Sequence, residues 1–211
     1  MRANRINLGK SSWRLRLVKD EESDEFLARE AVWSKEALGI LCEKYIPRIY
    51  GFALRRTGDI SDAEDITSSV FEKVVANIHG YDASKASFAT WIYRIALNTV
   101  NDYFRARKRK MEISCDQHEG SFGLALAGVD EVVSSRVDIL GLIGSLPSKY
   151  REALELRYFA GLRVGEIAQV LGISETAASK RILRGLERIR ASFSEEIGEG
   201  TASEVNKAPQ E

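Results

Sequence analysis

Apolar residues recur at every third or fourth position along most of this chain, and no stretch alternates for long enough to form a strand. The pattern therefore predicts an all-α protein. Long helices are expected over residues 35–56, 61–77, 88–110 and 132–143, and a shorter one over residues 23–31. Pro147 opens the next helix, which ends by Gly161, and two more helices follow within residues 162–190.

Residues 111–130 have no period and contain three glycines, so a domain boundary is expected there. The predicted organisation is an N-terminal extension and two small helical domains joined by a flexible linker, followed by a disordered polar tail. The corresponding ranges are 1–33 for the extension, 34–110 for the first domain, 111–131 for the linker, 132–193 for the second domain and 194–211 for the tail.

Helix ends can also be predicted from single residues. Ser34 is expected to start the first long helix and Gly58 to stop it, while Pro47 should kink that helix or split it in two. Ser61 and Glu64 have the spacing of a capping box for the helix that follows.

Residues 162–190 have the pattern of a helix-turn-helix. Gly172 suits the end of its first helix, and Ser174 suits the cap of its second. The second helix has a small apolar inner face, with Ala177, Ala178 and Ile182. Its outer face is cationic and polar, as expected of a recognition helix in a DNA groove rather than of a merely solvated hairpin. The candidate contacts to duplex DNA are Thr176, Ser179, Lys180, Arg181, Arg184 and Arg188.

A second candidate surface lies on the helix over residues 88–110. Arg94, Asn98 and Asn101 share a face near Trp91 and Tyr93, and this mixture of amides, cations and rings suits bases taken out of a stack. The two aromatic residues can equally be ordinary core. The helix ends in the basic run 105–110, in which Arg105, Arg107 and Lys108 are candidate phosphate contacts, although cations at a helix C-terminus also favour the dipole.

Composition and charge exclude only a few classes of function. Hydrophobic residues make up 44% of the chain and charged residues 29%, and the formal net charge of +0 hides separate acidic and basic stretches. The two cysteines, Cys42 and Cys115, lie far apart, and Cys115 with His118 lacks further ligands, so neither a metal nor another cofactor is expected. No apolar run is long enough for a membrane span, so we expect a cytoplasmic protein that does not insert into a membrane.

Three segments resemble a known family in the order in which that family has them. Residues 87–110 look like the promoter-melting region of bacterial RNA polymerase sigma factors of the extracytoplasmic-function group. Residues 61–74 resemble the helix that docks on the polymerase clamp in that family. Residues 146–190 are similar to the family's domain 4, which reads the −35 element.

This resemblance implies a sigma factor that binds core RNA polymerase and promoter DNA and performs no catalysis. Asp62, Glu64 and Asp65 would meet the clamp helices, and residues 81–87 would form part of a pocket for a −10 base beside Arg94, Asn98 and Asn101. The cations of residues 180–188 would face the −35 major groove. An anti-sigma factor would be the regulating partner.

The chain departs from the family pattern at two places. Ser68 and Ser69 stand where the family usually has Gln-Glu, and residues 177–179 replace a Thr-Val-basic run. The alternative function is a self-sufficient helix-turn-helix regulator that binds duplex DNA without polymerase. An enzyme is disfavoured, because the two histidines lie in unrelated settings and no nucleophile motif or phosphate loop is present.

Overall fold

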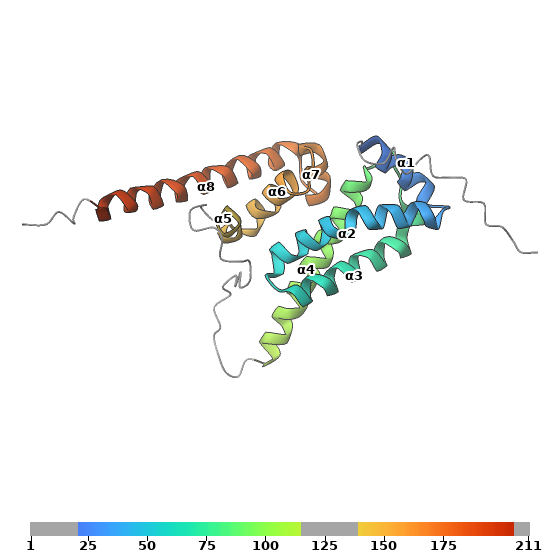
Figure 1. Cartoon of the computed structure of the whole chain (residues 1–211), viewed down its shortest axis with the longest axis horizontal. Coiled ribbons are helices and arrows are strands. Elements are labelled where there is room, and N and C mark those ends of the chain that lie inside the picture. The colour runs from blue at the N-terminus through green and yellow to red at the C-terminus, as the bar shows by residue number, and fades with distance from the viewer. Residues whose placement is uncertain (1–20, 115–138, 205–211) are drawn as a thin grey trace, which may run out of the picture.

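The computed structural model describes residues 21–114 and 139–204, and within these ranges the protein contains helices and no strand. The first domain contains α1 (Glu21–Ala31), α2 (Lys35–Thr57), α3 (Ile60–Asn77), the 3-10 turn η2 (Ile78–Gly80) and α4 (Phe88–Ser114). The second contains α5 (Ile139–Ser145), α6 (Ser148–Tyr158), α7 (Val164–Leu171) and α8 (Glu175–Glu204) (Figure 1). The predicted all-helical class with two helical units is confirmed for this part of the chain.

The core of the first domain is an aromatic and aliphatic layer between α2, α3 and α4. Leu41, Tyr45, Ile49 and Phe52 recur on one stripe of α2 and are buried. Tyr45 meets Phe88 of α4 edge-on, with ring centroids 5.1 Å apart, and Phe52 meets Tyr93 in the same way at 5.7 Å. The face of α4 that carries Phe88 and Tyr93 is therefore fixed against α2.

Helix α1 packs on α2 and belongs to this domain. Leu27, Ala28 and Ala31 are buried, and the carboxylate of Asp24 accepts hydrogen bonds from Tyr45 Oη, at 2.9 Å, and Lys44 Nζ. The expected extension 1–33 thus contains a packed helix from Glu21, while residues 1–20 lie outside the described part of the chain.

The ends of α2 are where the sequence predicts them. Ser34 Oγ accepts a hydrogen bond from the Ala37 amide at 3.2 Å, and Gly58 ends the helix with φ of 68°. Of the two outcomes expected at Pro47, a kink or a split, the split does not occur. Helix α2 runs through this exposed residue, which costs one backbone hydrogen bond, while buried Tyr45 and Ile49 hold the helix on both sides.

The predicted capping box at Ser61 is wrong. The cap of α3 lies two residues earlier than expected: it is Asp59, whose carboxylate accepts a hydrogen bond from the Asp62 amide at 2.9 Å. Aspartate caps a helix as well as serine does, and Asp59 directly follows the turn at Gly58. Ser61 therefore lies inside the helix.

Two helices are longer than the sequence predicts. Helix α4 continues to Ser114, into the expected linker, and residues 115–138 lie outside the described part of the chain. Helix α8 continues to Glu204, so the expected disorder of the tail is wrong for residues 194–204. Extending a helix that already exists costs far less than nucleating a new one, and the first proline after α8 is Pro209.

The second domain contains the predicted helix-turn-helix. Gly172 ends α7 with φ of 64°, and Ser174 Oγ accepts the Ala177 amide at 3.2 Å at the start of α8. Ala178 and Ile182 are buried against the domain, as their small apolar face predicts. Both signals are local, and both are confirmed.

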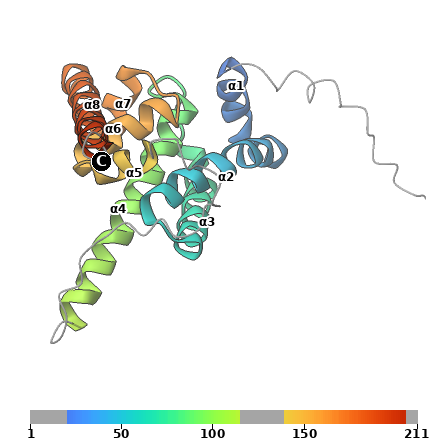
Figure 2. The ribbon, with the colours of Figure 1, turned by 60° about the vertical axis from the view of Figure 1, so that its left-hand side comes forward.

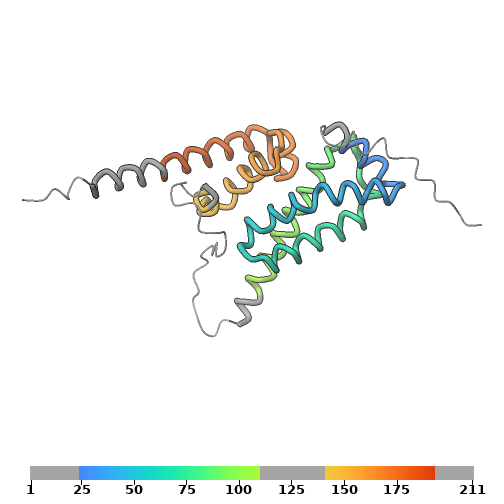
Figure 3. The backbone as a smooth tube through the Cα atoms, in the orientation of Figure 1, coloured from blue at the N-terminus to red at the C-terminus, as the bar shows by residue number. Residues whose placement is uncertain are grey.

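The two domains lie against each other. The sequence predicts two domains joined by a flexible linker and does not predict this contact. Helix α7 lies beside the N-terminal half of α4, in the view of Figure 1 and in the turned view of Figure 2. The backbone trace in Figure 3 shows that this contact joins segments far apart along the chain. At this contact Glu166 of α7 accepts hydrogen bonds from Ser87 Oγ at 2.6 Å and Thr90 Oγ1 at 3.3 Å.

Candidate nucleic-acid interface

The N-terminal half of α8 presents the cationic face that the sequence predicts. Lys180, Arg184 and Arg188 are exposed, and so is Thr176 at the start of the helix, whereas Ser179 and Arg181 are half-buried. Three exposed cations spaced by four residues follow one line along the helix. The geometry suits a helix inserted into a major groove.

Tyr150 of α6 contacts two of these cationic side chains, Arg184 and Arg188. The guanidinium of Arg188 lies over the Tyr150 ring, 5.3 Å from its centroid. Burial alone would raise the pKa of Tyr150, but the neighbouring cations of Lys149 and Arg184 outweigh it and lower the pKa. Arg184 and Arg188 are thereby positioned before any ligand binds.

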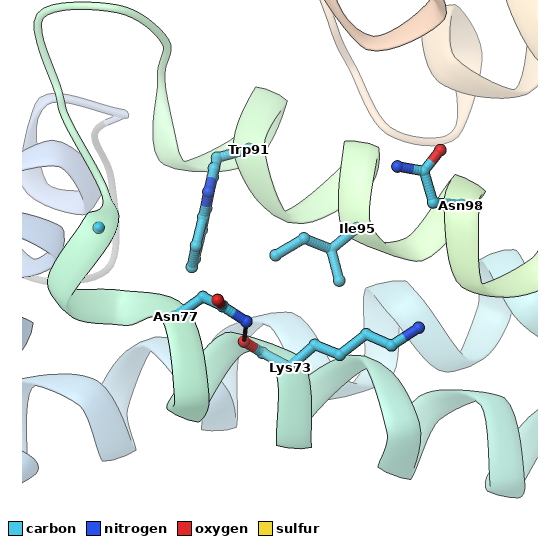
Figure 4. A pocket seen from close by; sticks show the side chains of 6 residues that line it. Lys73, Asn77, Trp91, Ile95 and Asn98 are labelled. Carbon is cyan, nitrogen blue, oxygen red and sulfur yellow. Dashed lines mark hydrogen bonds between the residues drawn. The ribbon is translucent and has the colours of Figure 1, made fainter.

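A cavity of about 420 Å³ lies between α3, η2 and α4. Its lining combines an indole, an isoleucine, two amides and a lysine: Trp91, Ile95, Asn98, Asn77, Lys73 and Gly80 (Figure 4). Asn77 Nδ2 donates to the Lys73 carbonyl at 2.7 Å, and Lys73 Nζ donates to Thr99 Oγ1 at 2.9 Å. The polar groups are thus held in place around an apolar floor.

The wall of this cavity is fixed by aromatic rings that pack on one another at tilted angles. Trp91 lies 5.4 Å from Tyr81 and 5.7 Å from Phe88, measured between ring centroids. Tyr81 Oη donates to the Ala86 carbonyl at 3.1 Å, which ties residues 81–87 to the same cluster. The half-buried indole is therefore held in position at the cavity.

The structure separates the residues predicted on the α4 face. Asn98 is exposed and lines the cavity, but neither Arg94 nor Asn101 does. Arg94 is exposed and donates a hydrogen bond to the Gln169 carbonyl of α7, and Asn101 is half-buried. Tyr93 is core. Lys73 and Asn77 were missed, although their four-residue spacing on α3 is a sign of a shared polar face.

The basic end of α4 is exposed at Arg105, Arg107 and Lys108. Arg105 pairs with Asp102 at 3.1 Å, and Arg107 pairs with Asp62 of α3 at 3.4 Å. Both pairs are at the surface and contribute little to stability. Phosphate oxygens are therefore able to compete for these guanidinium groups.

The three acidic residues at the start of α3 differ in their surroundings. Glu64 and Asp65 are exposed, whereas Asp62 is partly buried and accepts hydrogen bonds from Tyr103 Oη and Arg107. Partial burial and the hydrogen bond to Asp62 raise the pKa of Tyr103, which remains a donor. Asp62 thus joins α3 to α4, and Glu64 and Asp65 form the open acidic surface.

The described helices contain neither a metal-ligand cluster nor a membrane span. Within residues 21–114 and 139–204, no three His, Cys, Asp or Glu side chains are grouped as metal ligands would be, and Cys115 and His118 lie outside these ranges. None of the helices described has the length and apolar character needed to cross a membrane.

Known proteins similar to this chain share its domain order. Residues 41–110 match sigma-70 region 2, and residues 136–189 match sigma-70 region 4. The ECF RNA polymerase sigma factor SigM of Bacillus subtilis is 30% identical over 157 residues, covering 74% of this chain and 95% of SigM. SigW of the same organism is 34% identical over 168 residues, covering 74% of this chain and 88% of SigW.

Solved structures show the same fold. The sigma factor RpoE of Bartonella quintana, solved with the anti-sigma factor NepR, has a TM-score of 0.63 at 18% identity and covers 76% of this chain and 98% of its own. CnrH, solved with the cytosolic domain of CnrY, has a TM-score of 0.60 at 24% identity and covers 83% of this chain and 98% of its own. The chain belongs to the extracytoplasmic-function group of RNA polymerase sigma factors, non-enzymatic initiation factors that direct the polymerase to promoters.

Proposed function

We propose that the first domain captures a base of the melted −10 strand in the cavity between α3 and α4, while α8 reads the −35 duplex. The single observation that carries this assignment is the lining of the cavity. An indole wall, amides that pair with base edges and a lysine for the backbone are what an unstacked nucleotide requires.

The duplex contact is assigned to the outer face of α8. One line along the helix carries three exposed basic side chains, Lys180, Arg184 and Arg188. Lysine and arginine side chains form hydrogen bonds with guanine edges and phosphates. Thr176, Ser179 and Arg181 flank that line. Arg105, Arg107 and Lys108 at the end of α4 extend the phosphate contacts next to the melted strand.

Core polymerase supplies the chemistry, and this chain contributes binding and orientation only. We assign the clamp contact to Glu64 and Asp65, which are exposed on the first two turns of α3, with Asp62 holding that helix against α4. The polymerase and its promoters place this activity in the cytoplasm. An anti-sigma factor is the regulating partner that we infer, because RpoE and NepR form such a pair.

Run-off transcription with purified core enzyme on a promoter library tests this function. Addition of the chain should yield transcripts from a distinct set of promoters that core enzyme alone leaves silent. The opposite result identifies the rival function: a chain that shifts duplex DNA tightly without core polymerase and yields no transcripts is a self-sufficient regulator.

A further inference from the structure

Three basic side chains gather around one tyrosine of the second domain. Lys149 Nζ lies 4.9 Å from the centroid of the Tyr150 ring, and Arg188 Cζ lies 5.3 Å from the same centroid. Arg184, one turn before Arg188 on α8, contacts the Tyr150 hydroxyl. Lys149 and Tyr150 belong to α6, so two helices contribute to the group. We call Lys149, Arg184 and Arg188 the cation cluster.

The fold of the second domain does not require the cation cluster. Arg151, two residues after Lys149, shows how this domain uses a structural cation: its guanidinium is half-buried and donates to the carbonyl groups of Gly144 and Leu146. Lys149, by contrast, is exposed at the start of α6. A residue in that position needs no positive charge to begin the helix, because cations are unfavourable at a helix N-terminus.

The charges of the cation cluster are not balanced by acids. Among the side chains that the structure describes, no ion pair involves Lys149, Arg184 or Arg188. The charged groups that shift the pKa of Tyr150 are Lys149 and Arg184, and both lower it. Like charges held close together repel one another. A cluster of this kind is typical of a surface where an anion binds.

The arrangement suits one phosphate of a DNA backbone. A lysine ammonium is a compact charge and an arginine guanidinium is a planar fork, so the two together can surround the oxygens of a phosphodiester. Lys180, Arg184 and Arg188 follow one line along α8, and its two ends are about 12 Å apart along the helix axis. Lys149 meets the far end of this line. The same face can therefore contact base edges at one end and the sugar–phosphate backbone at the other.

We propose that Lys149 and Arg188, with Arg184 beside them, bind one backbone phosphate at the edge of the −35 element, so that α6 contacts the duplex as well as α8. Tyr150 is a positioning residue, because its ring holds the two cations on one site. A phosphate contact fixes the register of the protein on the duplex and carries no sequence information. The inference rests on the proposed duplex contact of α8, but base reading by Lys180 can fail or succeed separately.

The salt dependence of duplex binding is the primary measurement. Fluorescence anisotropy of the full chain is recorded over a range of low salt concentrations, on a −35 duplex and on a shuffled duplex of the same composition. Lys149→Ala should weaken binding to both duplexes by the same factor. The double variant Lys149→Ala, Arg188→Ala should reduce the slope of log affinity against log salt by about 0.9, the value for a single phosphate, and not by twice that amount.

Matched variants test whether the two cations share one phosphate. Lys149→Arg keeps the charge and should bind both duplexes like the wild type. Lys35→Ala removes one exposed lysine from α2 and should change neither the affinity nor the slope. The losses caused by Lys149→Ala and Arg188→Ala should combine to less than their product. The losses caused by Lys149→Ala and Lys180→Ala should multiply, because distant sites act independently.

Three results would overturn the phosphate site. The first is an unchanged slope in the double variant, and the second is a loss confined to the −35 duplex, which indicates a base contact. The third is a loss of affinity for core polymerase with unchanged DNA binding, which indicates an acidic protein partner.

The shuffled duplex separates this inference from the proposed function, because phosphate binding needs no −35 sequence. If Lys180→Ala leaves the preference for the −35 duplex unchanged while the double variant reduces the slope, the recognition-helix assignment fails and the phosphate site stands. If Lys180→Ala abolishes that preference and the double variant leaves the slope unchanged, the assignment stands and the phosphate site fails.

Discussion

A Cβ atom on Gly185 would stand 2.8 Å from Cδ1 of Leu154 and 3.1 Å from its Cγ, so any larger residue at this crossing of α8 and α6 must displace the buried Leu154 side chain. The Cβ atom of Tyr150 would lie 3.5 Å away, which is an ordinary van der Waals contact. This crossing holds the recognition helix on the rest of the second domain, and its fit determines the direction in which Arg184 and Arg188 project.

Gly185→Ala should therefore destabilise the protein by about 1–3 kcal/mol, as overpacking does in a close contact. Gly39→Ala in α2 is the matched control, because a Cβ there meets nothing within 4 Å and an alanine stabilises a helix interior by about 0.5–1 kcal/mol. Urea denaturation of the full chain measures both changes. Effects of the same sign for the two variants would contradict the close crossing.

Lys180→Ala and Arg184→Ala should each weaken binding of the polymerase complex to a −35 duplex by about 1–3 kcal/mol, the usual cost of a lost bidentate base contact. Fluorescence anisotropy at fixed salt measures this loss. Arg29→Ala, an exposed cation on α1, should have no such effect. Affinities that stay at the wild-type level for both α8 variants would remove the recognition-helix assignment.

Asn98→Ala should weaken capture of the melted −10 strand by about 1–2 kcal/mol, because one amide hydrogen bond to a base edge is lost. Asn101→Ala should cost less, since Asn101 does not line the cavity. A 2-aminopurine probe at successive −10 positions reports unstacking during open-complex formation. An equal signal for Asn98→Ala and the wild type would show that the base binds elsewhere.

Asp65→Arg should lower the affinity for core polymerase, because it places a cation on the acidic surface at the start of α3. Glu43→Arg provides the same change of charge on an exposed site of α2 and should leave the affinity unchanged. Pull-down with purified core enzyme measures both. Full recovery of core enzyme by Asp65→Arg would exclude this surface as the clamp contact.

Features that depend on neighbouring residues could be predicted from the sequence. Gly172 and Ser174 determine the turn of the helix-turn-helix, and Ser34 and Gly58 determine the ends of α2, because each acts through the backbone within four residues. Asp59 and Ser61 show the limit of that reasoning. Both are good caps, and the choice depends on where the chain leaves Gly58.

Features that depend on distant residues could not be predicted. Arg56 and Glu155 form a buried ion pair although they are 99 positions apart, and a cation in the last turn of a helix is ordinarily explained by the helix dipole alone. The cavity could not be predicted for the same reason. Lys73 and Asn98 belong to different helices, and their separation along the sequence does not indicate that they lie close together. Periodicity identifies the inner face of each helix, but it does not say which polar faces meet.

Helix α4 also acts as a ruler. It is one uninterrupted helix from Phe88 to Ser114, so Asn98 at the cavity and Arg107 in the basic end are held about 14 Å apart along its axis. A continuous helix cannot change its length to follow a nucleotide that is inserted into or deleted from the bound strand. If Asn98 binds the base and Arg107 a phosphate, as we propose, the protein itself sets the spacing between these two contacts, and promoters must match it.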